Sequence, residues 1–158
     1  MPQSTRISVT PLAQVPESHA LIQGWFEREW PDYYGPNGPG DACADLARYA
    51  NWGSLPMGMV ALLDGIPRGF AALKTEPFAE FTHWGPWLGA ACVEPGFRRQ
   101  GLGAALVRAL PGAAHQLGYT SVYCATATAG TLMRRSGWQR IACVDHEGHA
   151  TEIFQITL

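Results

Sequence analysis

Residues 93–103 read Val93-Glu94-Pro95-Gly96-Phe97-Arg98-Arg99-Gln100-Gly101-Leu102-Gly103 and join an apolar, strand-like run to a helix-like run of small and apolar residues. The first amide groups of a helix have no intrahelical partner, and the helix dipole adds positive charge at that end. Gly101 and Gly103 have no Cβ, so a ligand can approach the backbone closely there. Arg98 and Arg99 supply positive charge that does not titrate away near neutral pH. The segment therefore predicts a binding site for a phosphate or a pyrophosphate.

Two common phosphate-binding loops do not fit these residues. A Walker loop has a lysine after its second glycine, and the only lysine of the chain is Lys74. A dinucleotide fingerprint needs glycine or alanine where Leu106 stands, and an acidic residue about 20 positions further on, where this chain has none. The pattern that fits is Arg/Gln-x-x-Gly-x-Gly, from Arg98 to Gly103. In this pattern the chain resembles the GCN5-related N-acetyltransferase (GNAT) superfamily, whose corresponding loop binds the pyrophosphate of coenzyme A.

A second block of residues carries the same resemblance. The residues at the spacing of the family's C-terminal motif are Thr126, Ala129, Leu132, Met133, Gly137 and Trp138. The likeness extends over roughly residues 56–158, and the alternative is a purely structural glycine turn between a strand and a helix. The resemblance implies an α/β (α+β) fold, with a central mixed, mostly antiparallel, twisted sheet of about seven strands flanked by about four helices. It also implies a splay between the strand ending at Val93 and the strand starting at Ser121, where the pantetheine arm lies.

The composition agrees with a single N-acetyltransferase domain over residues 1–158. Of the 158 residues, 47% are hydrophobic and 15% are charged, which is typical of a compact chain with a real core. A formal net charge of −2 argues against non-specific binding to nucleic acid. No apolar run is long enough to cross a bilayer, and no signal peptide opens the chain. We therefore expect a cytoplasmic protein with neither a nucleic acid nor a membrane as its partner.

The cysteines argue against a metal site. Cys43, Cys92, Cys124 and Cys143 form no Cys-x-x-Cys pair and have no histidine at metal-ligand spacing. Three of them lie in apolar strand-like runs, where a free cysteine behaves as a small hydrophobic residue. A nucleophilic Cys124 would need an activating base beside it, whereas the family transfers the acyl group directly. We therefore expect reduced thiols and no bound metal.

The apolar patterns predict an alternation of strands and helices. Strands are expected over residues 6–10, 57–63, 69–74, 87–93, 121–125, 138–144 and 151–157. Helices are expected from residue 16 to residue 30, after a cap at Asp41, and over residues 101–117 and 129–136. The first helix is expected to bury one face, formed by Leu21, Ile22, Trp25 and Phe26. Pro111-Gly112 inside the third helix predicts a kink or a restart there.

The resemblance implies that acetyl-coenzyme A is the co-substrate and assigns its binding residues. These are Cys92, Val93, Arg98, Arg99, Gln100, Gly101, Leu102, Gly103, Ala104, Thr126 and Met133. In much of the family a tyrosine at the position of Met133 gives a proton to the departing thiolate. A thioether cannot act as an acid, so either another group substitutes or the thiolate leaves unaided.

Two residues are candidates for the catalytic acid or base. His83 lies just before the strand that leads to the loop, and an imidazole titrates at about 6.5 and can accept a proton near neutral pH. Tyr123 lies on the strand beyond the splay and could replace the missing tyrosine. The alternatives are a solvent-exposed loop histidine and a tyrosine that only packs in the core.

The acceptor is expected to bind between the first helices and the last hairpin. Asp32, Tyr33 and Tyr34 place aromatic rings beside a carboxylate, which suits a cation, and His146 lies in the last hairpin loop. In the alternative, the nearby acids Glu27 and Glu29 form only the solvated face of the first helix. The sequence thus predicts transfer of an acetyl group from acetyl-coenzyme A to a primary amine of a small molecule or a peptide, and allows a homodimer. The alternatives are an inactive coenzyme-A-binding sensor or partner domain, and an unrelated nucleotide or phosphate binder.

Overall fold

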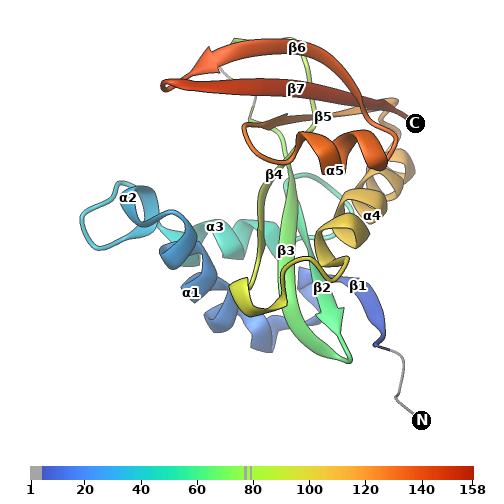
Figure 1. Ribbon diagram of the computed structural model, residues 1–158. Coiled ribbons are helices and arrows are strands. Elements are labelled where there is room, and N and C mark those ends of the chain that lie inside the picture. Colours follow the sequence, from blue (N-terminus) through green and yellow to red (C-terminus); the bar gives the residue numbers. More distant parts are fainter. Residues whose placement is uncertain (1–4, 77, 79) are drawn as a thin grey trace.

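The computed structural model describes residues 5–76, 78 and 80–158, and its centre is one seven-stranded sheet (Figure 1). The strands are β1 (Ile7–Pro11), β2 (Met57–Leu63), β3 (Ile66–Lys74), β4 (Trp87–Val93), β5 (Ser121–Thr126), β6 (Gln139–His146) and β7 (His149–Thr157). Their order across the sheet is β1-β2-β3-β4-β5-β7-β6, and only the β4–β5 pair is parallel. The mixed, mostly antiparallel sheet expected from the resemblance is confirmed.

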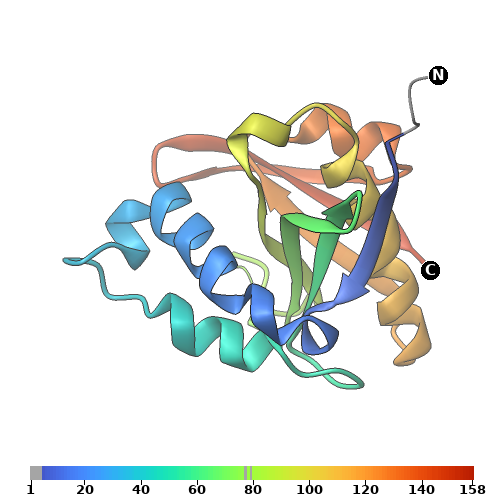
Figure 2. The same ribbon diagram turned by 90° about the horizontal axis from the view of Figure 1, so that it is seen from below.

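The described residues form five α-helices, which flank this sheet. They are α1 (His19–Glu29), α2 (Pro31–Tyr34), α3 (Ala42–Tyr49), α4 (Leu102–Gln116) and α5 (Gly130–Arg135). Figure 2 shows α1 and α3 on one side of the central strands and α4 on the other. Within the described residues, no helix has the length and apolar character needed to cross a membrane.

Alternation along the central strand β3 separates two hydrophobic clusters. Phe70 and Ala72 belong to the cluster built with α1 and α3. Ala71 and Leu73 belong to the cluster built with α4. Successive side chains of a strand point to opposite faces of the sheet, so β3 is buried on both faces. This double burial explains why its sequence is a continuous apolar run rather than an alternating pattern.

The sequence predicted the elements of the fold well, with two local errors. All seven expected strands are present, β4 has the predicted bounds, and Asp41 Oδ1 caps α3 by accepting a hydrogen bond from the Ala44 amide at 3.0 Å. The short helix α2 was not predicted. Leu21 was expected on the buried face of α1 but is 40% exposed. That face is formed by Ile22, Trp25 and Phe26, because the i, i+3, i+4 spacing turns Leu21 toward solvent.

Helix α4 continues through Pro111, so the restart considered above does not occur. A proline inside a helix removes one hydrogen bond, at a cost of about 3 kcal/mol. Leu106 and Leu110 before the proline, and Ala113 and Ala114 after it, are all buried in the same cluster. Packing on both sides of the proline therefore keeps the helix whole.

The sheet opens between β4 and β5. Two residue pairs join these strands, Trp87 with Tyr123 and Leu88 with Cys124. Immediately beyond them β4 carries a bulge. Phe70 pairs with Cys92 and Ala72 pairs with Gly89, so one residue of β3 lies opposite two residues of β4. Ala90, inside the bulge, has a φ of 51°. Bulges bend a strand and increase its twist, so this one turns β4 away from β5, and the predicted splay is confirmed.

Candidate functional site

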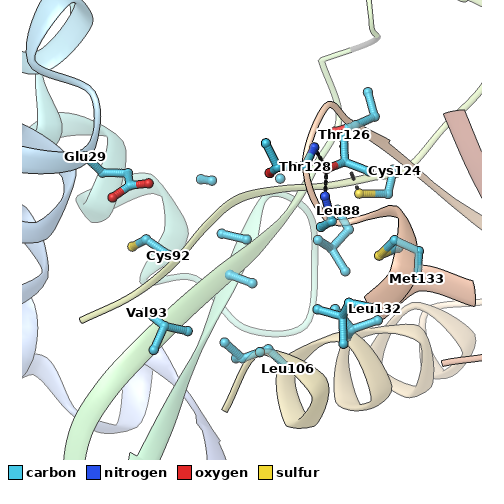
Figure 3. Close-up of a pocket in the computed structure, with 18 of the residues that line it drawn as sticks. Glu29, Leu88, Cys92, Val93, Leu106, Cys124, Thr126, Thr128, Leu132 and Met133 are labelled. Carbon is cyan, nitrogen blue, oxygen red and sulfur yellow. Dashed lines mark hydrogen bonds between the residues drawn. The ribbon is translucent and has the colours of Figure 1, made fainter. Parts of the chain in front are cut away.

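A cavity of about 550 Å³ occupies the opening between β4 and β5 (Figure 3). Its walls are residues 88–93 of β4, residues 124–129 at the end of β5 and the following turn, and side chains from α4 and α5. The α4 and α5 contributions are Gly103, Leu106, Val107, Leu132 and Met133. Most of these side chains are apolar and a few are polar, which is typical of a small-molecule site.

The start of α4 borders this cavity with free backbone amides. The first hydrogen bond of the helix joins the Ala105 amide to the Gly101 carbonyl at 3.0 Å. The amide groups of residues 102–104 precede that bond and have no intrahelical acceptor. Gly101 has a φ of 95°, a conformation that favours glycine. A Cβ on Gly103 would meet only Leu132 Cδ2, at 3.6 Å, so the helix presents its backbone here rather than a side chain.

Arg98 links the end of β4 to α1. Its Nε donates to the Val93 carbonyl at 3.0 Å, and its Nη2 donates to Glu29 Oε2 at 3.0 Å. Arg98 also lines the cavity. Arg99, the next residue, is exposed and has a φ of 63°, a backbone conformation that is strained for any residue other than glycine. Both arginines belong to the loop that leads into α4.

The opposite wall is formed by β5 and α5. Thr126 Oγ1 accepts hydrogen bonds from the amides of Thr128 at 3.2 Å and Ala129 at 2.9 Å, which closes the turn before α5. Met133 is 1% exposed and packs in the α4 cluster while still lining the cavity. Burial raises the pKa of the Cys124 thiol to about 12. The thiol is therefore protonated and uncharged near neutral pH.

The structure brings most of the predicted coenzyme-A residues to one place. Those that line the cavity are Cys92, Val93, Arg98, Gly103, Thr126 and Met133. The others form the adjoining loop and first helical turn, at Arg99, Gln100, Gly101, Leu102 and Ala104. Their roles in binding stay predictions, and their positions are consistent with them.

Neither predicted catalytic residue lines the cavity. The Tyr123 ring stacks on Trp84, with centroids 5.3 Å apart, and its hydroxyl accepts a hydrogen bond from Gln155 Nε2 at 3.2 Å. Because Cys124 faces the cavity, strand alternation turns Tyr123 to the other face of β5. His83 is exposed and lies beside Trp84, at 5.0 Å between centroids. A catalytic role of His83 or Tyr123 stays a prediction, and the cavity lining does not add support for it.

The predicted acceptor residues also lie outside the cavity lining. The Tyr34 hydroxyl donates to Asp45 Oδ2 at 2.6 Å, and burial together with this carboxylate raises the pKa of the phenol. Asp32 and Tyr33 are exposed on α2. The His146 ring lies 4.6 Å from that of Phe78, between centroids. The structure therefore does not bring these four predicted residues together around the cavity.

The sequence analysis did not single out Glu29, which lines the cavity from the end of α1. Trp30, the next residue, also contributes to the wall. In the sequence, Glu29 has the ordinary pattern of an exposed helix face, and no local signal distinguishes it from Glu27. Its location depends on how α1 packs against β4, which becomes visible only in three dimensions. In the part of the chain that the structure describes, no three histidine, cysteine or acidic side chains cluster as a metal site would require.

The sequence and the fold both match known proteins. Residues 21–135 match the family model described as Acetyltransferase (GNAT) family. A search of the curated proteins found no significant match. Similar solved structures include yncA from Salmonella typhimurium with its cofactor acetyl-CoA (TM-score 0.73, 16% identity, 98% of this chain and 94% of that one). An aminoglycoside 6′-N-acetyltransferase complexed with coenzyme A gives a TM-score of 0.74 at 11% identity, covering 95% and 96% of the two chains. A GNAT-family acetyltransferase from Streptococcus pneumoniae gives 0.68 at 15% identity, covering 98% and 100%.

Proposed function

Because the chain belongs to the acetyltransferase (GNAT) family, we propose that it transfers an acetyl group directly from acetyl-coenzyme A to a primary amine of a small molecule or a peptide. The observation that carries this proposal is the cavity between β4 and β5, with the first turn of α4 at its border. Two of the similar structures contain acetyl-CoA or coenzyme A. A cytoplasmic location, a homodimer and a single domain over residues 1–158 stay predictions.

The first turn of α4 is the proposed site of the pyrophosphate. The free amides of residues 102–104 can donate hydrogen bonds to phosphate oxygens, and the helix dipole favours the negative charge. Gly101 and Gly103 leave room for close approach, and the exposed Arg99 adds a cation at the loop. Beyond Leu88, the edge of β4 that faces the cavity has no β5 partner. Its backbone groups are therefore available to the amides of a pantetheine arm.

Acetyl transfer requires a polarised thioester carbonyl and a balanced movement of protons. Amide groups freed by the bulge around Ala90 can donate to the carbonyl oxygen, whose negative charge grows in the transition state. A C–N bond forms and the C–S bond breaks. A cationic acceptor first releases one proton to solvent and becomes the nucleophilic amine. The attacking nitrogen then loses a second proton, and the departing thiolate gains one. Met133 has no acidic proton to give. A thiolate is a good enough leaving group to depart without a proton from the protein.

The two buried thiols of the cavity should not take part in the transfer. Burial raises the pKa of both Cys92 and Cys124 to about 12, and the thiolate is the nucleophilic form. Replacing Cys124 with alanine is expected to change turnover less than about threefold, because no acyl-cysteine forms. Intact-mass measurement after incubation with acetyl-CoA should show no acetylated protein thiol. An acetyl adduct that the Cys124→Ala variant lacks would instead establish a two-step mechanism.

Thermal unfolding tests whether the protein binds the donor. At a concentration near 100 times its Kd, acetyl-CoA should stabilise the fold by about 2.7 kcal/mol. For a chain of this size that raises Tm by roughly 5–10 °C. ATP and NAD should give smaller shifts, because they do not use the cavity between the strands. A shift no larger with acetyl-CoA than with ATP or NAD would contradict the proposal and favour an unrelated nucleotide site.

A screen for thiol release with a set of amines distinguishes an enzyme from a domain that only binds coenzyme A. We expect release that depends on both acetyl-CoA and an amine. Stabilisation by acetyl-CoA without turnover on any amine would support the inactive coenzyme-A-binding alternative.

A further inference from the structure

Glu29 places a carboxylate on the wall of the cavity, at the C-terminal end of α1. Its side chain is 41% exposed and points toward the interior, across from Thr126 and Thr128 (Figure 3). A second cavity of about 130 Å³ adjoins the first, and both are lined by Glu29, Cys92 and Val93. The carboxylate is therefore accessible to a ligand that reaches the cavity from the side of α1.

Among the described residues that line the larger cavity, no other side chain is negatively charged. Glu94, which lines the smaller cavity, is paired with Arg68 at 2.7 Å. The titratable groups among the described lining residues of the larger cavity are Glu29, Arg98, Cys92 and Cys124. Arg98 is a cation, and both thiols have pKa values raised to about 12 by burial, so they are uncharged near neutral pH. The negative charge of Glu29 is itself among the causes that raise the pKa of Cys92. A positively charged ligand group in the larger cavity can therefore pair with one anionic side chain of the described lining, that of Glu29.

The contacts of Glu29 leave it able to bind a further donor. Its Oε2 accepts a hydrogen bond from Arg98 at 3.0 Å, and Arg98 also donates to the Val93 carbonyl. A carboxylate has two oxygens with about four lone-pair sites, so Oε1 remains available to an ammonium group. The Arg98 contacts hold the carboxylate near the end of β4, on the side of the cavity away from the α5 wall.

We propose that Glu29 is the binding group for the acceptor, and that the acceptor carries an amine that is cationic at neutral pH. This inference rests on the proposed acetyl transfer. Alkyl amines, amino sugars and lysine side chains belong to this chemical class, whereas arylamines are neutral and gain nothing from the carboxylate. A hydrogen bond between an ammonium and a carboxylate is about twice as strong as one between neutral groups. Glu29 would therefore select acceptors by charge.

The test compares Glu29→Gln with the wild type on four named amines. The cationic amines are n-butylamine, kanamycin and the tripeptide Gly-Lys-Gly, and p-anisidine is the neutral one. For the best cationic acceptor, Glu29→Gln should lower kcat/KM by about 10- to 100-fold, mainly through KM. Stabilisation by acetyl-CoA should be retained, because a glutamine oxygen can still accept the hydrogen bond from Arg98. Glu27→Gln is the matched control, because Glu27 is exposed on the same helix and does not line the cavity.

The outcomes separate this inference from the proposed function. A Glu29→Gln variant with unaltered kcat/KM for a cationic amine would overturn the inference. So would a wild-type protein that binds acetyl-CoA but acetylates only p-anisidine, or none of the four amines. Failure of acetyl-CoA to stabilise the wild-type protein would instead remove the proposed acetyl transfer itself.

Discussion

The variant Gly103→Asp is expected to bind acetyl-CoA roughly 100- to 1,000-fold more weakly than the wild type while remaining folded. Gly103 lies in the first turn of α4, among the amides that have no intrahelical acceptor, and it lines the cavity. An aspartate there brings a carboxylate against the pyrophosphate, and juxtaposed like charges cost several kcal/mol. The fold should tolerate the change, because a Cβ at this position has only an ordinary contact with Leu132. Calorimetric titration with acetyl-CoA measures the loss directly.

Two control variants separate charge from bulk and from general effects on the helix. Gly103→Asn has nearly the same size as the aspartate without its charge, so we expect a smaller loss than for Gly103→Asp. Gly112→Asp makes the same change further along α4, at an exposed position where a Cβ would meet nothing within 4 Å. It should bind acetyl-CoA as the wild type does. Full affinity in a folded Gly103→Asp variant would show that the pyrophosphate binds elsewhere.

The location of the proposed donor loop beside the cavity was predictable from the sequence, because the loop and its two flanking elements are contiguous in the chain. A strand, a glycine-bearing loop and a helix start follow one another within residues 87–104, and local rules of chain geometry fix where their amides point. The turn at Asp64-Gly65 also depends on a local signal, because an Asp-Gly pair favours a two-residue hairpin turn. Both residues have a positive φ, as the two-residue hairpin between β2 and β3 requires.

The acceptor part depends on contacts between distant segments, and there the sequence was less informative. Glu29 reaches the cavity beside Arg98, a partner 69 positions away in the chain. Tyr123 and Cys124 are neighbours in one strand, and only the observed sheet tells which of the two faces the cavity. Periodicity indicates that alternate residues share a face. It does not indicate which face borders a ligand.

A second large effect is expected on stability, from Gly58→Val in β2. A Cβ at Gly58 would lie 2.5 Å from two ring atoms of Phe70 and 3.2 Å from the Cβ of Tyr49. Both aromatic residues are at most 1% exposed, so neither ring can move aside into solvent. Overpacking of this kind costs about 3 kcal/mol. For a chain of this size, the expected fall in Tm is roughly 6–12 °C.

The same substitution also tests the contact between residue 58 and Phe70, which connects the core to the helix beside the cavity. Phe70 packs against Phe26 of α1, with ring centroids 5.4 Å apart. The hydrophobic cluster that has room for the Phe70 ring only because residue 58 is glycine therefore also holds α1, the helix that carries Glu29, against the sheet. Adding Phe70→Leu to Gly58→Val removes the ring that the new side chain strikes. The double variant should therefore lose less stability than the sum of the two single changes, because the two sites share one contact. Strictly additive losses in Tm would mean that the contact with the Phe70 ring is not what excludes larger side chains at this position.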